Sequence, residues 1–231
     1  MSLPFTIDQF LDVFRRYNES IWPGQWALNL LAVVAVAAAV RGGRGASRAA
    51  SGIVAALWMW TGLVYHVGFF RAINPAALLF GSAFFIEAAL IVWFGVVRST
   101  LRFEAGANGA TLVGSVLIVY ALVAYPLIGY ALGHRYPSTP TFGVPCPMTI
   151  FTFGLVLLCP PPRPRTLIII PVGWAVLGVM AALQLGMWED IGLVIAAIVT
   201  STIVVVQRPR PRDIVADRGA PIAATSSAVS R

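Results

Sequence analysis

The sequence has little charge and no lysine. Only 11% of its 231 residues are charged and 58% are hydrophobic, whereas an ordinary soluble domain is about 25% charged. A soluble domain of this length leaves too much of its chain exposed to hide so much apolar surface. The composition therefore predicts an integral membrane protein. Because no lysine is present, the chain cannot form the Schiff base of a retinal protein.

Cysteine is also scarce, and no segment resembles a cleavable signal peptide. Cys146 and Cys159 lie on one predicted helix, roughly 20 Å apart at 1.5 Å per residue. A disulfide requires Cα atoms within about 7 Å, so we expect no bridge between them and no dithiol redox enzyme. The N-terminus lacks a basic region followed by a continuous apolar run, so we expect the first span to insert as its own uncleaved signal.

Seven apolar stretches approach the roughly 20 residues that a helix needs to cross the hydrocarbon. They lie at about 25–40, 50–70, 74–97, 109–132, 146–160, 166–185 and 190–206. The fifth is short, so we expect it to be tilted or kinked, or to thin the bilayer locally. The sequence thus predicts an all-α polytopic transmembrane helix bundle of about seven spans over residues 25–206.

The two ends of the chain differ from this bundle. Residues 1–24 predict an amphipathic helix that begins at a Thr6–Gln9 capping box. Its apolar face carries Ile7, Phe10, Leu11, Phe14 and Ile21. Such a helix lies in the membrane interface or packs on the bundle as a short lid. Residues 207–231 alternate Arg and Pro and then become small and polar, which predicts a disordered cytoplasmic tail that contacts anionic inner-leaflet lipids.

The arginines predict the orientation. The net charge is +7, but the arginines stand at the ends of apolar runs, a placement that favours a topology signal over nucleic-acid binding. With seven spans and the N-terminus outside, the inner side receives Arg41, Arg44, Arg48, Arg98, Arg102, Arg163, Arg165 and the tail arginines. The outer side receives only Arg15, Arg16, Arg71 and Arg135. We therefore expect a multi-pass protein of the cell membrane with its C-terminus inside.

This orientation gathers most of the unusual polar residues near the outer face. The candidate ligand-binding residues are Tyr65, His66, Arg71, Asn74, Glu87, His134, Tyr136, Cys146 and Glu189. Glu87 lies deeper than the others, near the middle of its span. A carboxyl group at that depth is costly and indicates either a proton or cation relay or a neutral group hydrogen-bonded to a neighbouring helix. The pair Glu189-Asp190 is expected in the outer aqueous region.

Three of these residues suggest metal or haem chemistry. His66, His134 and Cys146 offer imidazole and thiolate ligands for zinc, copper or softer ions. The two histidines, on different helices at similar depth, also suit axial ligation of one haem. The alternative is that both histidines are hydrogen-bonded interface residues and that Cys146 is a small buried hydrophobic residue. No phosphate-binding loop, dinucleotide fingerprint or His-Glu-x-x-His motif is present.

Several short motifs support a resemblance to a known family. They are Tyr65-His66, Phe69-Phe70, Ile73-Asn74-Pro75-Ala76, Gly133-His134, Tyr136-Pro137, Phe142-Gly143, Pro145-Cys146-Pro147 and Thr149-Ile150-Phe151-Thr152, after an opening from Phe10 to Tyr17. The chain resembles a bacterial multi-pass membrane family that is labelled as a domain of unknown function. The resemblance implies membrane residence and implies no reaction.

The function expected from the sequence is binding or transport rather than catalysis. We expect a small solute or ion to bind at the outer face. Two alternatives stay open. One is a membrane-embedded haem or metal redox protein that uses His66 and His134, and the other is a non-catalytic membrane subunit whose rim binds another protein.

Overall fold

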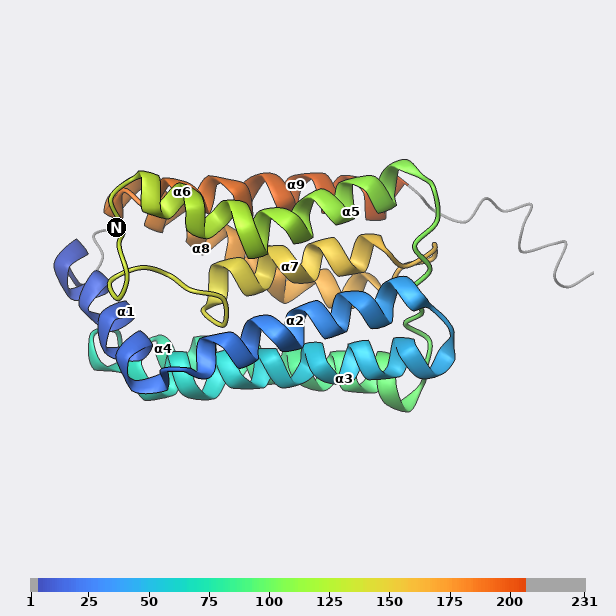
Figure 1. The fold of residues 1–231 in the computed structure, drawn as a ribbon, viewed down its shortest axis with the longest axis horizontal. Coiled ribbons are helices and arrows are strands. Elements are labelled where there is room, and N and C mark those ends of the chain that lie inside the picture. Colours follow the sequence, from blue (N-terminus) through green and yellow to red (C-terminus); the bar gives the residue numbers. More distant parts are fainter. Residues whose placement is uncertain (1–3, 207–231) are drawn as a thin grey trace, which may run out of the picture.

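The computed structural model describes residues 4–206, so the predicted tail at 207–231 lies outside the described residues. Six helical stretches are long and apolar enough to cross a membrane: Gly24–Arg41, Arg44–Ala72, Ala77–Val97, Gly109–Ala131, Arg165–Leu185 and Trp188–Val206. The shorter apolar helix Pro145–Leu157 lies at the centre of the bundle (Figure 1). The prediction of an all-α membrane bundle with about seven segments is therefore confirmed.

Most spans are not uniform α-helices. The helices are α1 (Ile7–Ile21), α2 (Gly24–Arg41), α3 (Arg44–Trp60), α4 (Ala77–Ile91), α5 (Gly109–Val119), α6 (Tyr125–Ala131), α7 (Pro145–Leu157), α8 (Ile169–Leu185) and α9 (Ile191–Val206). Wider π-helical segments at Thr61–Phe69, Val92–Val97 and Tyr120–Ala124 interrupt the second, third and fourth spans. Short 3₁₀ turns at Phe70–Ala72, Arg165–Ile168 and Trp188–Asp190 complete the helical elements. π-Helical turns are rare and often mark functional sites.

The connections gather at the two ends of the bundle as the predicted topology requires. The α2–α3 turn and the connections before α5 and after α7 lie at one end, which we call the Arg-rich end (Figure 1). Helix α1 and the other turns lie at the opposite end, the α1 end. By the positive-inside rule we expect the Arg-rich end to face the cytoplasm.

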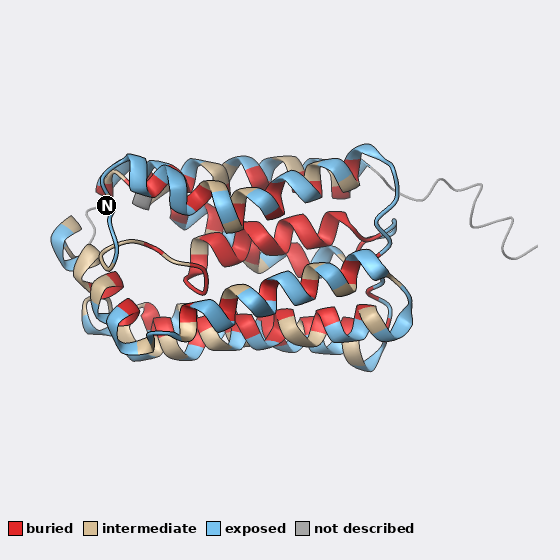
Figure 2. Cartoon of the chain, viewed as in Figure 1, coloured by how far each residue is buried: buried red, intermediate tan, exposed pale blue. Residues whose placement is uncertain are grey.

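The fifth crossing is completed by a non-helical loop. Helix α7 has 13 residues, or about 20 Å of rise, whereas the hydrocarbon is about 30 Å thick. The connection from α6 folds back into the bundle and α7 begins partway along it (Figure 1). Every residue of α7 except Cys146 is buried (Figure 2). Irregular backbone is tolerated at membrane depth only where protein surrounds it, so the buried loop replaces the missing helical length.

Side chains from α1 and from the π-helical segment Thr61–Phe69 satisfy the backbone of this loop. The Asn18 amide Nδ2 donates to the carbonyl oxygens of Pro137 at 2.7 Å and Thr139 at 2.8 Å. Thr61 Oγ1 donates to the Gly143 carbonyl at 3.0 Å, so Gly143 lies level with the middle of the second span. Buried backbone carbonyls without partners are costly, and these bonds remove that cost.

Helix α1 packs as a lid on the α1 end of the bundle. The predicted capping box is present, because Thr6 and Gln9 exchange backbone-to-side-chain hydrogen bonds. Its face around Phe14 and Tyr17 joins an apolar cluster with Tyr65 and other bundle residues. Burial raises the pKa of the Tyr17 hydroxyl, because a charged phenolate is disfavoured away from water. The lid arrangement that the sequence left open is therefore present in the structure.

Helix α5 and the central helix α7 cross with their backbones in close contact. A Cβ atom added to Gly154 would lie 2.7 Å from the Gly114 carbonyl oxygen, and one added to Gly114 would lie 2.6 Å from that of Gly154. Small residues of this kind let two membrane helices approach backbone to backbone. The crossing fixes α7, and with it the start of α7, against the outer ring of helices.

We expect Gly154→Ala to destabilise the bundle, because the new methyl group overlaps the Gly114 carbonyl. Overpacking of this kind costs roughly 1–3 kcal/mol, and the thermal midpoint in detergent measures it. Gly173→Ala on α8 is the matched control, since no neighbouring atom lies within 4 Å of its added Cβ. Equal midpoints for Gly154→Ala and the wild type would contradict the close crossing.

Candidate functional site

A partly open cavity lies at the α1 end between α1, α4, α7, α8 and the segment before α9. Its volume is about 270 Å³ and its walls are mostly apolar and rich in aromatic residues, with Phe5, Phe10, Phe70, Phe80 and Trp174 among the lining residues. We call it the aromatic pocket. Ligand sites are typically such concave apolar cavities with a few convergent polar groups. The polar groups on this wall therefore determine which ligand the cavity suits.

A buried carboxylate supplies the main polar group of the aromatic pocket. Asp190 lines the pocket although its residue is almost fully buried. The Tyr125 hydroxyl donates to Asp190 Oδ1 at 2.6 Å, and Cys146, at the first turn of α7, lines the same wall. Asn74 also lines the pocket, and its side chain accepts from the Ala76 backbone N–H at 3.0 Å. One acid and several hydrogen-bonding groups therefore face an aromatic cavity.

The neighbouring acid, Glu189, pairs with a histidine and does not line the aromatic pocket. Glu189 Oε1 lies 2.8 Å from His134 Nδ1, and the side chain of Glu189 is 0% exposed. The Tyr120 hydroxyl donates to the Glu189 backbone carbonyl at 2.8 Å. The sequence placed Glu189 and Asp190 in water at the outer face, and this prediction is wrong because both are buried. The pair Glu189–His134 ties the end of α6 to the α8–α9 turn.

His66 lies one layer behind the pocket wall. It is fully buried in the π-helical segment Thr61–Phe69. Its ring is 5.4 Å from that of Tyr65 and 5.1 Å from that of Trp174, centroid to centroid, and both neighbours line the aromatic pocket. Neither ring nitrogen has a hydrogen-bond partner within the described part of the chain. His66 therefore supports the pocket wall without reaching the cavity.

Glu87 and two rim residues do not line the pocket. Glu87 is buried on α4, and within residues 4–206 neither of its carboxylate oxygens has a hydrogen-bond partner. Arg71 is exposed in the turn before α4. Tyr136 is exposed and packs edge-on against Trp22. Of the predicted ligand-binding residues, the structure brings Tyr65, Asn74 and Cys146 to the cavity.

The three predicted metal ligands occupy separate surroundings. Aromatic rings enclose His66, His134 pairs with Glu189, and Cys146 lies in the pocket wall. Among the described residues no group of three or more His, Cys, Asp or Glu side chains is placed to hold a metal ion. Both cysteines are free, which agrees with the spacing argument.

The predicted ligand-binding residues did not include Asp190, Tyr125 or Trp174, although the sequence placed Asp190 beside Glu189 at the outer face. Asp190 had a usable signal, because an acid at the first turn of an apolar span is costly and usually functional. Tyr125 and Trp174 are ordinary aromatic residues of their spans. Only the packing of α6 and α8 against the start of α7 shows that both residues line the cavity.

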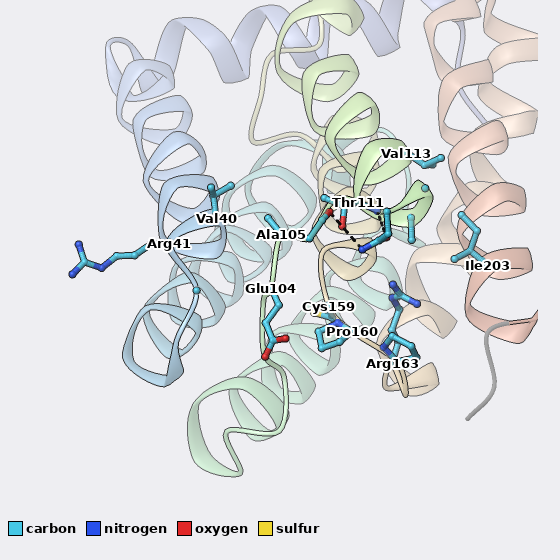
Figure 3. Close-up of a pocket in the computed structure, with 16 residues that line it drawn as sticks. Val40, Arg41, Glu104, Ala105, Thr111, Val113, Cys159, Pro160, Arg163 and Ile203 are labelled. Carbon is cyan, nitrogen blue, oxygen red and sulfur yellow. Dashed lines mark hydrogen bonds between the residues drawn. The ribbon is translucent and has the colours of Figure 1, made fainter. Parts of the chain in front are cut away.

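A second, wider cleft lies at the Arg-rich end (Figure 3). Its volume is about 890 Å³, and the end of α2, the start of α5 and the connection after α7 line it. Arg41 points away from it in Figure 3. The Arg163 side chain donates to the carbonyl oxygens of Val156 at 3.2 Å and Leu157 at 3.3 Å, and burial raises the pKa of the Cys159 thiol to about 12. These contacts cap the end of α7, so the narrower and less open aromatic pocket is the better candidate for a ligand site.

A sequence family that is described only as being of unknown function matches residues 7–214. No curated protein matches the chain. No solved structure matches it either.

We expect Glu189→Ala to destabilise the protein, because it removes the 2.8 Å contact with His134, whose side chain is only 13% exposed. Removing one partner of a largely buried hydrogen bond costs about 1–3 kcal/mol, which a lowered thermal midpoint in detergent would report. In a double-mutant cycle with His134→Ala, the two losses should be far from additive. Glu19→Ala removes an exposed ion pair with Arg15 and should leave the midpoint unchanged. Additive losses in the cycle would contradict the pairing.

Proposed function

We propose that this chain, which belongs to the DUF6064 family of unknown function, is a membrane protein that binds a small, mostly apolar ligand in the aromatic pocket. The ligand would carry one cationic or hydrogen-bond-donating group, such as an amine. The observation that supports this most directly is the single acid, Asp190, on the wall of a largely apolar cavity that is rich in aromatic residues.

The walls favour an apolar body. Phe5, Phe10, Phe70 and Phe80 present ring surfaces to the cavity, and Leu185 and Met187 add aliphatic surface. Burial of apolar surface stabilises a bound ligand by roughly 25 cal/mol per Å². A volume of about 270 Å³ lies at the lower end of the range for ligand pockets, about 300–1,000 Å³. The pocket is therefore suited to a small molecule rather than a polymer or a whole lipid.

The polar groups favour a donor or a cation. A carboxylate only accepts hydrogen bonds, and Tyr125 already donates to one oxygen of Asp190. An ammonium group beside Asp190 would neutralise a charge that is costly to bury alone. The faces of Tyr65 and Trp174 on the same wall would also attract a cation. An anionic ligand would face repulsion from Asp190 at the same place.

The lid helix α1 covers one side of the site and limits the access of water to it. Phe10 and Phe14 of α1 line the aromatic pocket, so α1 forms one of its walls. Phe10 contacts Phe70 with ring centroids 5.9 Å apart. Excluding water strengthens the attraction between Asp190 and a cationic group, because the effective dielectric falls.

Photolabelling in lipid nanodiscs tests the proposal. The probe is a phenylalkylamine that carries a diazirine, and a matched phenylalkane without the amine is the comparison ligand. We expect saturable labelling of peptides from α8 and the α8–α9 turn. Asp190→Asn should weaken amine binding about tenfold to a hundredfold, since a hydrogen bond to a charged group contributes roughly 1.5–3 kcal/mol. Binding of the phenylalkane should change little.

Glu104→Gln is the matched control. Glu104 lines the cleft at the Arg-rich end, so its loss of charge should leave amine binding unchanged. Absence of saturable labelling in the wild type would contradict the pocket as a ligand site. Equal loss of amine and phenylalkane binding in Asp190→Asn would contradict the assigned role of the carboxylate.

A further inference from the structure

A smaller groove opens beside the aromatic pocket, between α2 and the fourth span. Its volume is about 210 Å³. Trp22, Trp26 and Asn29 line one side, and Leu122 and Tyr125 line the other. We call it the lateral groove.

The mouth of the lateral groove faces the surface that lipid contacts. Trp26 is 69% exposed and Trp22 is 58% exposed. Both lie where α2 begins, at the α1 end. Tryptophan is enriched where a membrane protein meets the headgroup region. The groove therefore opens toward the leaflet at the α1 end rather than toward bulk water alone.

The lateral groove and the aromatic pocket share a wall. Tyr125 and Pro140 line both cavities. The rest of each lining is different, so these two residues separate the two spaces. A rotation of Tyr125 or a shift of the loop at Pro140 would join them.

The backbone around Tyr125 is suited to movement. Tyr125 follows the π-helical segment Tyr120–Ala124 directly. Pro126 comes next, and proline has no N–H to donate to the carbonyl four residues earlier while its ring crowds that carbonyl. Helical hydrogen bonding is therefore weakened at this turn, which accounts for the wider π-helical geometry before it.

Few bonds hold the shared wall closed. The Tyr125 hydroxyl donates to Asp190 at 2.6 Å, and the loop around Pro140 is tied to Asn18 through Thr139 and Thr141. These are side-chain hydrogen bonds, each worth only about 0.5–3 kcal/mol. A ligand amine that takes the place of Tyr125 at Asp190 would release the Tyr125 side chain.

The lateral groove also carries polar groups for a ligand in transit. Gln25 is buried and lines the groove, and its Oε1 has no hydrogen-bond partner in the part of the chain that the structure describes. Because Oε1 is an acceptor, it matches the donor group expected at Asp190. The groove thus resembles the pocket in combining aromatic surface with a buried hydrogen-bond acceptor.

We propose that the lateral groove is the route by which an amphipathic amine dissolved in the membrane reaches the aromatic pocket, with Tyr125 and Pro140 as its gate. The inference rests on the proposed function of the pocket. It adds that the ligand comes from the leaflet at the α1 end and not from the aqueous phase. A ligand that partitions into lipid is consistent with the apolar walls of both cavities.

Binding kinetics in nanodiscs test the route with the diazirine phenylalkylamine and time-resolved photolabelling. Leu122 lines the groove but not the pocket, so Leu122→Trp should obstruct passage without touching bound ligand. We expect association and dissociation rates to fall together by about tenfold while Kd stays within about twofold, since a gate changes rates and not equilibrium affinity. Val123→Trp is the control, because Val123 is 52% exposed and faces away from both cavities.

A second variant covers the case in which Leu122→Trp fails to fold. Trp26→Ala removes an exposed side chain from the mouth of the groove, so it should raise both rates severalfold at constant Kd. Wild-type rates in both variants, with saturable binding intact, would overturn the lateral route and leave the pocket standing. Absence of saturable binding in the wild type would instead overturn the proposed function itself.

Discussion

The structure depends on satisfying the backbone of one non-helical loop inside the bundle. Residues 137–144 take the place of the helical turns that α7 lacks, and lipid offers no hydrogen bonds to their carbonyl groups. Asn18 of α1 and Thr61 of the second span supply the donors. Without these donors, burying the loop that leads to α7 would leave carbonyl groups without hydrogen bonds at a high cost in free energy. The start of α7 would then not lie partway along the bundle.

This constraint also creates the candidate site. Because α7 begins inside the bundle, space remains between its first turn and the α1 end. Cys146 on that first turn and Asp190 at the start of the last span line the resulting cavity, and α1 covers it. Phe10 and Phe14, which line the pocket, lie on the same helix as Asn18, which binds the loop, so the lid and the fifth crossing are parts of one arrangement. A change at Asn18 would therefore affect both.

The sequence predicted the spans well because apolar length is a local property. The predicted start of the third span, near residue 74, lies close to the start of α4 at Ala77. The capping box at Thr6 was equally local.

The candidate site was predicted less completely. His66 and His134 were expected at one depth near a shared site, but His66 lies within aromatic rings and His134 pairs with Glu189. Which side of a helix faces a cavity depends on the rotation of the helix about its axis. A span embedded in lipid is only weakly amphipathic, so its sequence does not indicate this rotation.

The sequence by itself therefore determined that the chain is a membrane protein. It also determined the approximate bounds of the helices and which connections lie at the same end of the bundle. These follow from apolar length and from the placement of arginines, which act residue by residue against the bilayer. Tertiary structure alone decided that Asp190 is buried, that it meets Tyr125 from the fourth span, and that the aromatic pocket exists. Asp190 is 65 residues from Tyr125 in the chain, and only the packing of several helices around the short α7 brings such distant groups together.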